Sequence, residues 1–171
     1  SSFIMRTLNF WRNTPLRVLL APMEGVIDYT MRALLCQAGH IDRCVTEFIR
    51  VTDQQLPDKV FHRLCPELKQ GGMTRGGVPV FIQLLGSLPQ SMAANAQKAA
   101  ELGAPGIDLN FGCPAKTVNR SGGGSVLLQD PSQVYDVIQA VRAAVPKQTP
   151  VTAKIRLGFN DSSIFHDNVR A

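Results

Sequence analysis

A cysteine that follows a short apolar segment is the residue of this chain best placed to do chemistry. Cys113 lies within residues 106–114, read GIDLNFGCP, where an apolar strand runs into a turn. Gly112 removes a side chain beside the thiol, and Pro114 fixes the backbone just after it. A cysteine at the carboxyl end of a parallel strand lies where α/β folds hold their catalytic groups. The alternative is a buried structural cysteine, a common residue of protein cores.

Two cations, Lys154 and Arg156, alternate with other residues in a later apolar segment, residues 151–157. Side chains two positions apart in a strand point to the same side of the sheet. A cation inside a barrel is costly to bury unless an anionic group meets it, so an inward lysine here indicates an anionic ligand. A strand lysine that is solvated on the outer face is the alternative.

Polar or reactive residues also lie at the ends of the other apolar segments of the chain. Amides, a thiol and cations at successive strand ends suit a planar heterocycle with several carbonyl and N–H edges, together with a second ring to be protonated. The residues at the predicted strand ends are Pro22 and Met23 (first), Glu47 and Arg50 (second), Gln83 (third), Asn110 and Cys113 (fourth), and Lys154 and Arg156 (fifth).

The elements that must position these residues alternate between strand and helix. Asp28 is the expected N-cap and Gly39 the stop of the first helix, and Pro131 is expected in the first turn of the last. One helix, residues 90–102, is expected to place Asn95, Gln97 and Lys98 on its solvent side. The predicted strands are 18–21, 44–51, 78–84, 107–110 and 150–157, and the predicted helices are 28–38, 57–64, 90–102 and from 131 onward.

This alternation predicts an α/β fold with a parallel sheet and right-handed crossovers. A complete (β/α)8 TIM barrel takes about 250 residues, or about 30 for each repeat. The 171 residues of this chain would supply about the first five βα units, so we predict a TIM barrel truncated at that point. An open doubly wound sheet is the competing fold, although no G-x-G-x-x-G motif follows the first strand.

The composition is that of a folded protein domain with a mild excess of positive charge. Hydrophobic residues make up 44% of the chain, and the net charge of +5 suggests an anionic partner such as RNA or a phosphorylated ligand. No segment approaches the roughly 20 apolar residues of a membrane-spanning helix. The cysteines show neither zinc-ligand spacing nor a disulfide framework, so we expect no metal, a reducing cytoplasm, and structural roles for Cys36, Cys44 and Cys65.

Six motifs, in order along the chain, resemble those of the tRNA-dihydrouridine synthases, most of all the bacterial C type. The resemblance implies an FMN-dependent (β/α)8 barrel followed by a helical RNA-binding domain. The implied reaction reduces the C5–C6 double bond of a uridine in the tRNA D-loop, at position 16 for the C type. NADPH then reduces the flavin again. The motifs are residues 21–26 (APMEGV), 83–86 (QLLG), 108–114 (DLNFGCP), 116–118 (KTV), 121–124 (SGGG) and 154–158 (KIRLG), within a match from about Val18 to Gly158.

The resemblance assigns four residues to the flavin. Pro22 and Met23 would pack beside the isoalloxazine and offer backbone contacts. Gln83 would hydrogen-bond the pyrimidine edge of the ring, and Lys154 would lie beside its N1–C2 carbonyl. A cation near N1 stabilises the negative charge of a reduced flavin, so the residue types fit these implied roles.

The resemblance assigns a second group of residues to tRNA. Asn110 and Arg156 would hold the uracil. By their charge, Lys116 and Arg120 could hold phosphates at the rim, and the alternative is that both are solvated surface residues. Cys113 would be the acid that protonates C5 after hydride reaches C6 from flavin N5, acting as a thiol rather than a thiolate. The target base must leave its stack to reach such a site.

Two departures from the family pattern bear on these expectations. Phe111 stands where relatives often carry a smaller residue, and would either narrow the mouth or pack behind it. We expect residues 1–17 to be an N-terminal extension and 18–171 the amino-terminal part of a barrel whose last three strands and RNA-binding domain are absent. Such a fragment would bind FMN poorly and have little activity, whereas the full-length protein is expected to be a monomer.

Two other functions are compatible with the residues. One is another FMN-dependent TIM-barrel oxidoreductase, acting on a free pyrimidine as the dihydroorotate and dihydropyrimidine dehydrogenases do, because an asparagine and a cysteine follow a strand there too. The other is an inactive fragment that only associates with RNA.

Overall fold

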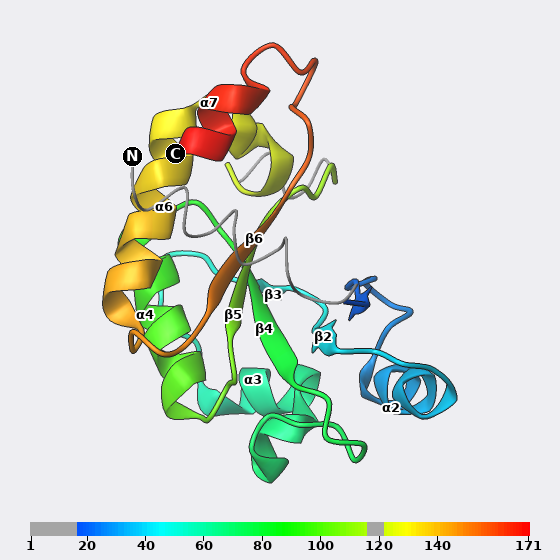
Figure 1. The fold of residues 1–171 in the computed structure, drawn as a ribbon. Helices are drawn as coiled ribbons and strands as arrows, with labels where there is room; N and C mark the ends of the chain where they lie inside the picture. The colour runs from blue at the N-terminus through cyan, green and yellow to red at the C-terminus, as the bar shows by residue number, and fades with distance from the viewer. Residues whose placement is uncertain (1–16, 116–121) are drawn as a thin grey trace.

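Parallel strands and the helices between them form the core of this computed structural model, which describes residues 17–115 and 122–171 (Figure 1). In the described part, the strands are β1 (Leu19–Leu20), β2 (Arg43–Val45), β3 (Ile49–Arg50), β4 (Val80–Leu85), β5 (Ile107–Phe111) and β6 (Val151–Ile155). The α-helices there are α2 (Tyr29–Ala38), α3 (Asp58–Leu64), α4 (Pro89–Glu101), α6 (Pro131–Ala144) and α7 (Phe165–Arg170), and the 3-10 helices are η1 (Pro66–Gln70) and η2 (Gly124–Gln129).

The strand order follows the chain order. The sheet runs β1-β2-β4-β5-β6, with β3 also paired to β4, and every one of these pairings is parallel. A doubly wound sheet would reverse its strand order at a switch point, and no reversal occurs among the described strands. Sequential parallel strands joined through helices are the first part of a TIM barrel. The predicted fold class is confirmed, and the doubly wound alternative is wrong.

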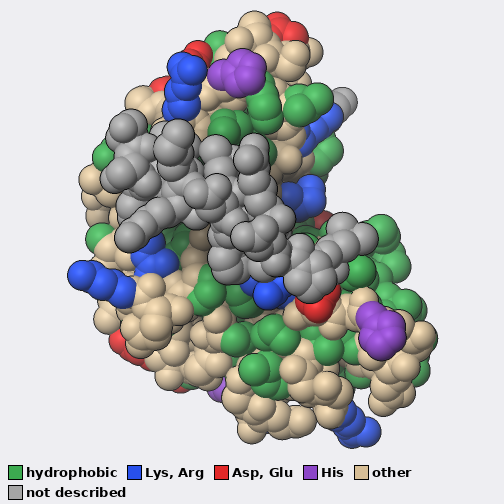
Figure 2. All heavy atoms as spheres, in the orientation of Figure 1, with side chains coloured by type: hydrophobic (Ala, Val, Ile, Leu, Met, Phe, Trp, Pro, Cys, Tyr) green, Lys and Arg blue, Asp and Glu red, His purple; other side chains and the backbone are tan. Residues whose placement is uncertain are grey.

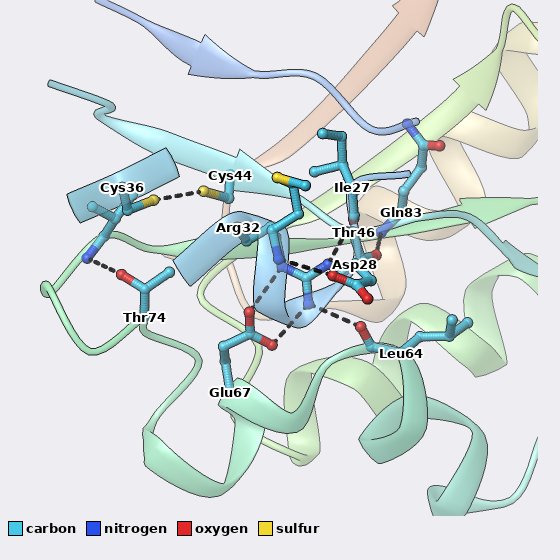
Figure 3. A network of polar contacts seen from close by, with 12 residues as sticks. Ile27, Asp28, Arg32, Cys36, Cys44, Thr46, Leu64, Glu67, Thr74 and Gln83 are labelled. Carbon is cyan, nitrogen blue, oxygen red and sulfur yellow. Dashed lines mark hydrogen bonds and ion pairs between the residues drawn. The ribbon is translucent and has the colours of Figure 1, made fainter. Parts of the chain in front are cut away.

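The second strand of the barrel is broken, where the sequence predicted one strand over 44–51. The Thr46 N–H donates to the Phe81 carbonyl as a strand residue does, at 2.9 Å. However, the next donor of β4, the Gln83 N–H, bonds the Thr46 hydroxyl oxygen at 3.1 Å instead of a main-chain carbonyl (Figure 3). The side chain therefore replaces one rung of the ladder, and β2 and β3 form on either side of it.

Helix ends agree with the capping residues of the sequence. The Asp28 carboxylate accepts the Met31 N–H at 2.8 Å, and the Gly39 N–H closes α2 on the Leu35 carbonyl at 3.1 Å. Pro131 begins α6, where its missing N–H costs no hydrogen bond.

The expectation for Asn95 is wrong. Its side chain is fully buried in α4 rather than solvated. The side-chain oxygen accepts the Leu56 N–H at 2.9 Å, and the amide nitrogen donates to the Gln54 carbonyl at 3.0 Å. Asn95 therefore fixes the loop after β3 to the helix, a tertiary role that helical periodicity does not reveal.

Alternate residues of the central strands face opposite sides. Val80, Ile82 and Leu84 of β4, with Ile107, Leu109 and Phe111 of β5, join the apolar core that also includes buried residues of α4 and α6. Phe111 therefore packs behind the sheet and does not narrow a mouth. The intervening residues Gln83, Asp108 and Asn110 are buried and polar. One side of the sheet thus joins the apolar core, and the other carries the hydrogen-bonding groups together with the buried Phe81 and Leu85.

A buried ion pair connects α2 to η1. The Arg32 Nε lies 2.8 Å from Glu67 Oε1 and its Nη2 lies 2.9 Å from Oε2, with both side chains at most 1% exposed (Figure 3). The guanidinium also donates to the carbonyls of Ile27, at 3.2 Å, and Leu64, at 3.0 Å. Burial lowers the pKa of Arg32, but the Glu67 hydrogen bonds and charge outweigh it and the net shift is upward. The pair ties the end of the loop between β1 and α2 to the helices beneath it.

Cysteines 44 and 65 are fully buried, and all four thiols, which lie in the described ranges, are free. This agrees with structural roles for Cys44 and Cys65. Among the described residues, no helix is long and apolar enough to cross a membrane, and no three His, Cys, Asp or Glu side chains gather as metal ligands do.

Candidate active site

A chain of hydrogen bonds crosses three neighbouring strands on the polar side of the sheet. Strand register sets Gln83 of β4 and Thr152 of β6 on either side of Asp108 in β5. The Gln83 Nε2 donates to Asp108 Oδ2 at 2.7 Å, and the Thr152 hydroxyl donates to Oδ1 at 2.6 Å. The carboxylate of Asp108 is thus held from both neighbouring strands. Burial raises its pKa, although the bonds from Gln83 and Thr152 and the charges of Lys154 and Arg43 oppose the rise.

The same chain continues to the turn that holds the thiol. The Asn110 Nδ2 donates to Gln83 Oε1 at 2.9 Å. The Asn110 Oδ1 accepts the N–H groups of Gly112 and Cys113, each at 2.9 Å. Cys113 is half-buried at this point. The asparagine therefore fixes the backbone of the turn, and the turn carries the thiol at the end of β5.

The two predicted cations lie beside that turn. Lys154 pairs with Asn110 in the register of β5 and β6, and Arg156 follows the last residue of β6. A Cβ placed on Gly112 would lie 3.4 Å from Lys154 Nζ and 3.5 Å from Arg156 Cγ. Both side chains are exposed. Lys154 and Arg156 therefore share one side of the strand, as their spacing predicted, and a larger residue at Gly112 would crowd the ammonium.

The loop after β1 carries Pro22 and Met23 at the same end of the sheet. Its main chain turns at Met23, whose carbonyl accepts the N–H of Ile27 at 2.9 Å, and Met23 itself is 56% exposed. The Gly25 N–H donates to the Glu47 carboxylate from the second barrel strand. Pro22 and Met23 therefore present apolar surface at a strand end, as the sequence predicted, on a loop anchored to the neighbouring strand.

Two cavities open beside these loops. The larger, about 520 Å³, lies between the loop after β1, the region around β3, and α3. The smaller, about 370 Å³, lies at the ends of β3 and β4 beside Gly123. The charged residues that line the larger cavity are Glu24, Glu47, Arg50 and Arg63, and it also reaches Ala115, two residues after Cys113. On the face seen in Figure 2, visible Lys and Arg side chains are dispersed among uncharged ones, and some lie beside its hollowed edge.

The structure brings together Gln83, Asn110, Cys113, Lys154 and Arg156, whereas Lys116 and Arg120 lie outside the described residues. Sequence reasoning missed Asp108, which holds Gln83, and Thr152, which holds Asp108 from the neighbouring strand. The sequence could have placed Asp108 at the site, because residues two positions apart on a strand, such as Asp108 and Asn110, lie on the same face of the sheet. It also missed Arg63, which only the fold of α3 brings to the larger cavity.

Comparisons with known proteins agree with this arrangement. The family model described as "Dihydrouridine synthase (Dus)" matches residues 19–170. A tRNA-dihydrouridine(16) synthase of Shewanella oneidensis is 58% identical over 156 residues, which cover 91% of this chain and 50% of that protein. The synthase of Vibrio parahaemolyticus is 62% identical over 85% of this chain, and the match covers 45% of that protein. The synthase of Escherichia coli is 56% identical over 85% of this chain, and the match covers 46% of that protein.

This chain spans about half the length of the curated relatives that it matches. The family model nevertheless covers nearly all of the described part, including the strand ends that hold Gln83, Asn110, Cys113 and Lys154. The chain belongs to the dihydrouridine synthase family, which is flavin-dependent.

Proposed function

We propose that the protein, at its full length, reduces a uridine of the tRNA D-loop to 5,6-dihydrouridine, with FMN as cofactor and NADPH as reductant. The observation that carries this proposal is the Cys113 turn. The backbone of this turn is pinned by Asn110 and flanked by Lys154 and Arg156. A thiol, an amide and two cations at adjacent strand ends can together orient a pyrimidine and protonate it.

The donor set fits a flavin. Lys154 offers an exposed ammonium, which would stabilise the negative charge of a reduced flavin ring at N1. Gln83 keeps one N–H and one lone pair after its bonds to Asp108 and Asn110. Its side chain is fully buried in this structure, so its contact with one edge of the ring is proposed from the family resemblance. Pro22 and Met23 would supply apolar contacts. When bound, FMN supplies the hydride for the reduction, and NADPH restores it.

The chain's own residues would bind and protonate the uridine. Arg156, exposed beside the turn, would contact the uracil together with Asn110. The Cys113 thiol would hold the proton that C5 receives. The uridine must first unstack, at a cost that contacts to the tRNA backbone would offset, Lys116 among them. The relatives named above act at position 16 by name, and we propose the same position here, in the cytoplasm and by a monomer.

The domain assignment is part of this proposal. Residues 18–171 would be the amino-terminal part of the catalytic barrel, and 1–17 an extension ahead of it. Residues 1–16 lie outside the part of the chain that the structure describes.

The test uses the full-length protein with its flavin reduced by NADPH without oxygen. Mixing with tRNA that lacks dihydrouridine should reoxidise the flavin, and mass spectrometry should place the new dihydrouridine at position 16. Reoxidation by free uracil or orotate but not by tRNA would instead assign the protein to the enzymes of free pyrimidines. A flavin-free protein that still binds tRNA would leave only an RNA-associating role.

A further inference from the structure

Asp108 is a buried acid that no step of the proposed reaction uses. It is the second residue of β5, 6% exposed, two residues before Asn110. Both of its oxygens accept hydrogen bonds, one from Gln83 at 2.7 Å and one from Thr152 at 2.6 Å. Nothing at this position touches the turn of Cys113 directly, so any effect on the thiol must pass through Gln83 and Asn110.

The direction of donation along this series of hydrogen bonds is fixed at its Asp108 end. A carboxylate only accepts, so Gln83 must turn its NH2 toward Asp108 and its carbonyl oxygen toward Asn110. Asn110 must then turn its own NH2 toward Gln83, which leaves its oxygen for the N–H groups of Gly112 and Cys113. The Gly112 and Cys113 N–H groups only donate, so they require the same orientation of Asn110 from the other end. Flipping either amide alone would set like groups against both of its neighbours. Each amide therefore has one workable orientation, which Asp108 holds from one end and the turn holds from the other.

We infer that Asp108 is a positioning residue for this site, which holds the orientation of the Gln83 amide and, through Gln83, restrains Asn110 and the Cys113 turn. This inference rests on the proposed function, to which it adds the group that aligns both the flavin-edge amide and the acid. Bonds to a charged acceptor are about twice as strong as neutral ones, so Asp108 is well suited to bias two neutral amides.

The test compares Asp108→Asn with Asp136→Asn in the full-length protein, since Asp136 is an exposed acid of α6. Asparagine carries no charge and can also present a donor to Gln83, so it holds the Gln83 amide more weakly than the carboxylate does. We expect amide hydrogen exchange in residues 109–115 to accelerate by about tenfold or more in Asp108→Asn, with α6 unchanged, as the loss of a hydrogen bond to a charged group implies. The matched Asp136→Asn variant should exchange as the wild type does.

A kinetic readout accompanies the exchange measurement. Asp108→Asn protein that has been loaded with flavin and reduced by NADPH should be reoxidised by tRNA about tenfold or more slowly than the wild type. The exchange result does not depend on activity, so it tests the positioning role even if tRNA proves not to be the substrate.

A second variant keeps the inference testable if Asp108→Asn does not fold. Gln83→Leu removes the link between Asp108 and Asn110 and should accelerate exchange at the same residues, with no further acceleration in the double variant. Unchanged exchange at residues 109–115 in either single variant would overturn the inference. Equal acceleration throughout the sheet would also overturn it, by making Asp108 a residue of general stability.

Discussion

Replacing Glu67 by glutamine tests how the loop between β1 and α2 is supported. The substitution keeps the volume of the side chain but removes its charge. Arg32, fully buried and bonded to both Glu67 oxygens at 2.8 and 2.9 Å, would then be a cation without a counter-ion. The glutamine NH2 would also face guanidinium N–H groups, so at least one contact would become repulsive.

The expected loss is large because both partners are out of water. Glu67 is 1% exposed and Arg32 is 0% exposed, and breaking such a pair by removing one charge costs about 3–5 kcal/mol. The carbonyls of Ile27 and Leu64 would keep their bonds to Arg32, which limits the loss to the ion pair itself. Arg32→Met combined with Glu67→Gln should recover part of the loss, since no unpaired charge remains buried.

The assay is urea unfolding of the full-length protein followed by circular dichroism, with matching slopes required for the comparison. The control is Asp58→Asn, which breaks the pair between Asp58 and Lys98, 3.2 Å apart and with side chains 56% and 25% exposed. That variant should lose no more than about 1 kcal/mol, because exposed pairs contribute little. A loss for Glu67→Gln no larger than that of Asp58→Asn would refute the reasoning.

Two further predictions concern packing and pH. Gly106→Ala would place a Cβ 2.3–2.5 Å from the Phe81 ring and should destabilise the protein by about 1–3 kcal/mol in the same assay. The control Gly76→Ala, whose Cβ would have its nearest atom 3.9 Å away, should leave the stability unchanged. Equal effects of the two variants would contradict the packing. Burial raises the pKa of the Cys44 thiol from its ordinary value of 9.0 to about 12, with a contribution from its contact to Cys36. Its contribution to stability is therefore full below pH 9 and is lost between about pH 9 and 12, so the urea midpoint should fall over that range in the wild type and less in Cys44→Ala.

Local signals in the sequence were enough to predict the order of the strands and the helices α2, α3, α4 and α6, whereas α7, η1 and η2 were not predicted. Asp28, Gly39 and Pro131 mark helix ends through backbone chemistry that operates within a few residues, and the structure has each as predicted. The burial of Asn95 and the break at Thr46 could not be predicted in this way, because both depend on partners 37 or more residues away.

The candidate site also combines local features that the sequence predicts with distant contacts that it does not. The turn at Cys113 is a local motif, and its asparagine was recognised as a polar group at a strand end. The bonds that connect it to Gln83 and Asp108 depend on strand register, which single-strand patterns leave open. The alternation of side chains along a strand predicts that Asp108 and Asn110 share a face. It does not predict that Gln83 of the neighbouring strand bonds to both.

The role of Cys113 can be measured most directly in a single turnover. Full-length Cys113→Ala protein, reduced by NADPH without oxygen, would be mixed with tRNA that lacks dihydrouridine, and flavin absorbance followed with time. We predict normal flavin content and normal reduction, but reoxidation by tRNA slowed by about a hundredfold or more, the usual contribution of a positioned acid. Reoxidation at the wild-type rate, with dihydrouridine formed, would contradict the assignment of the thiol as the proton donor.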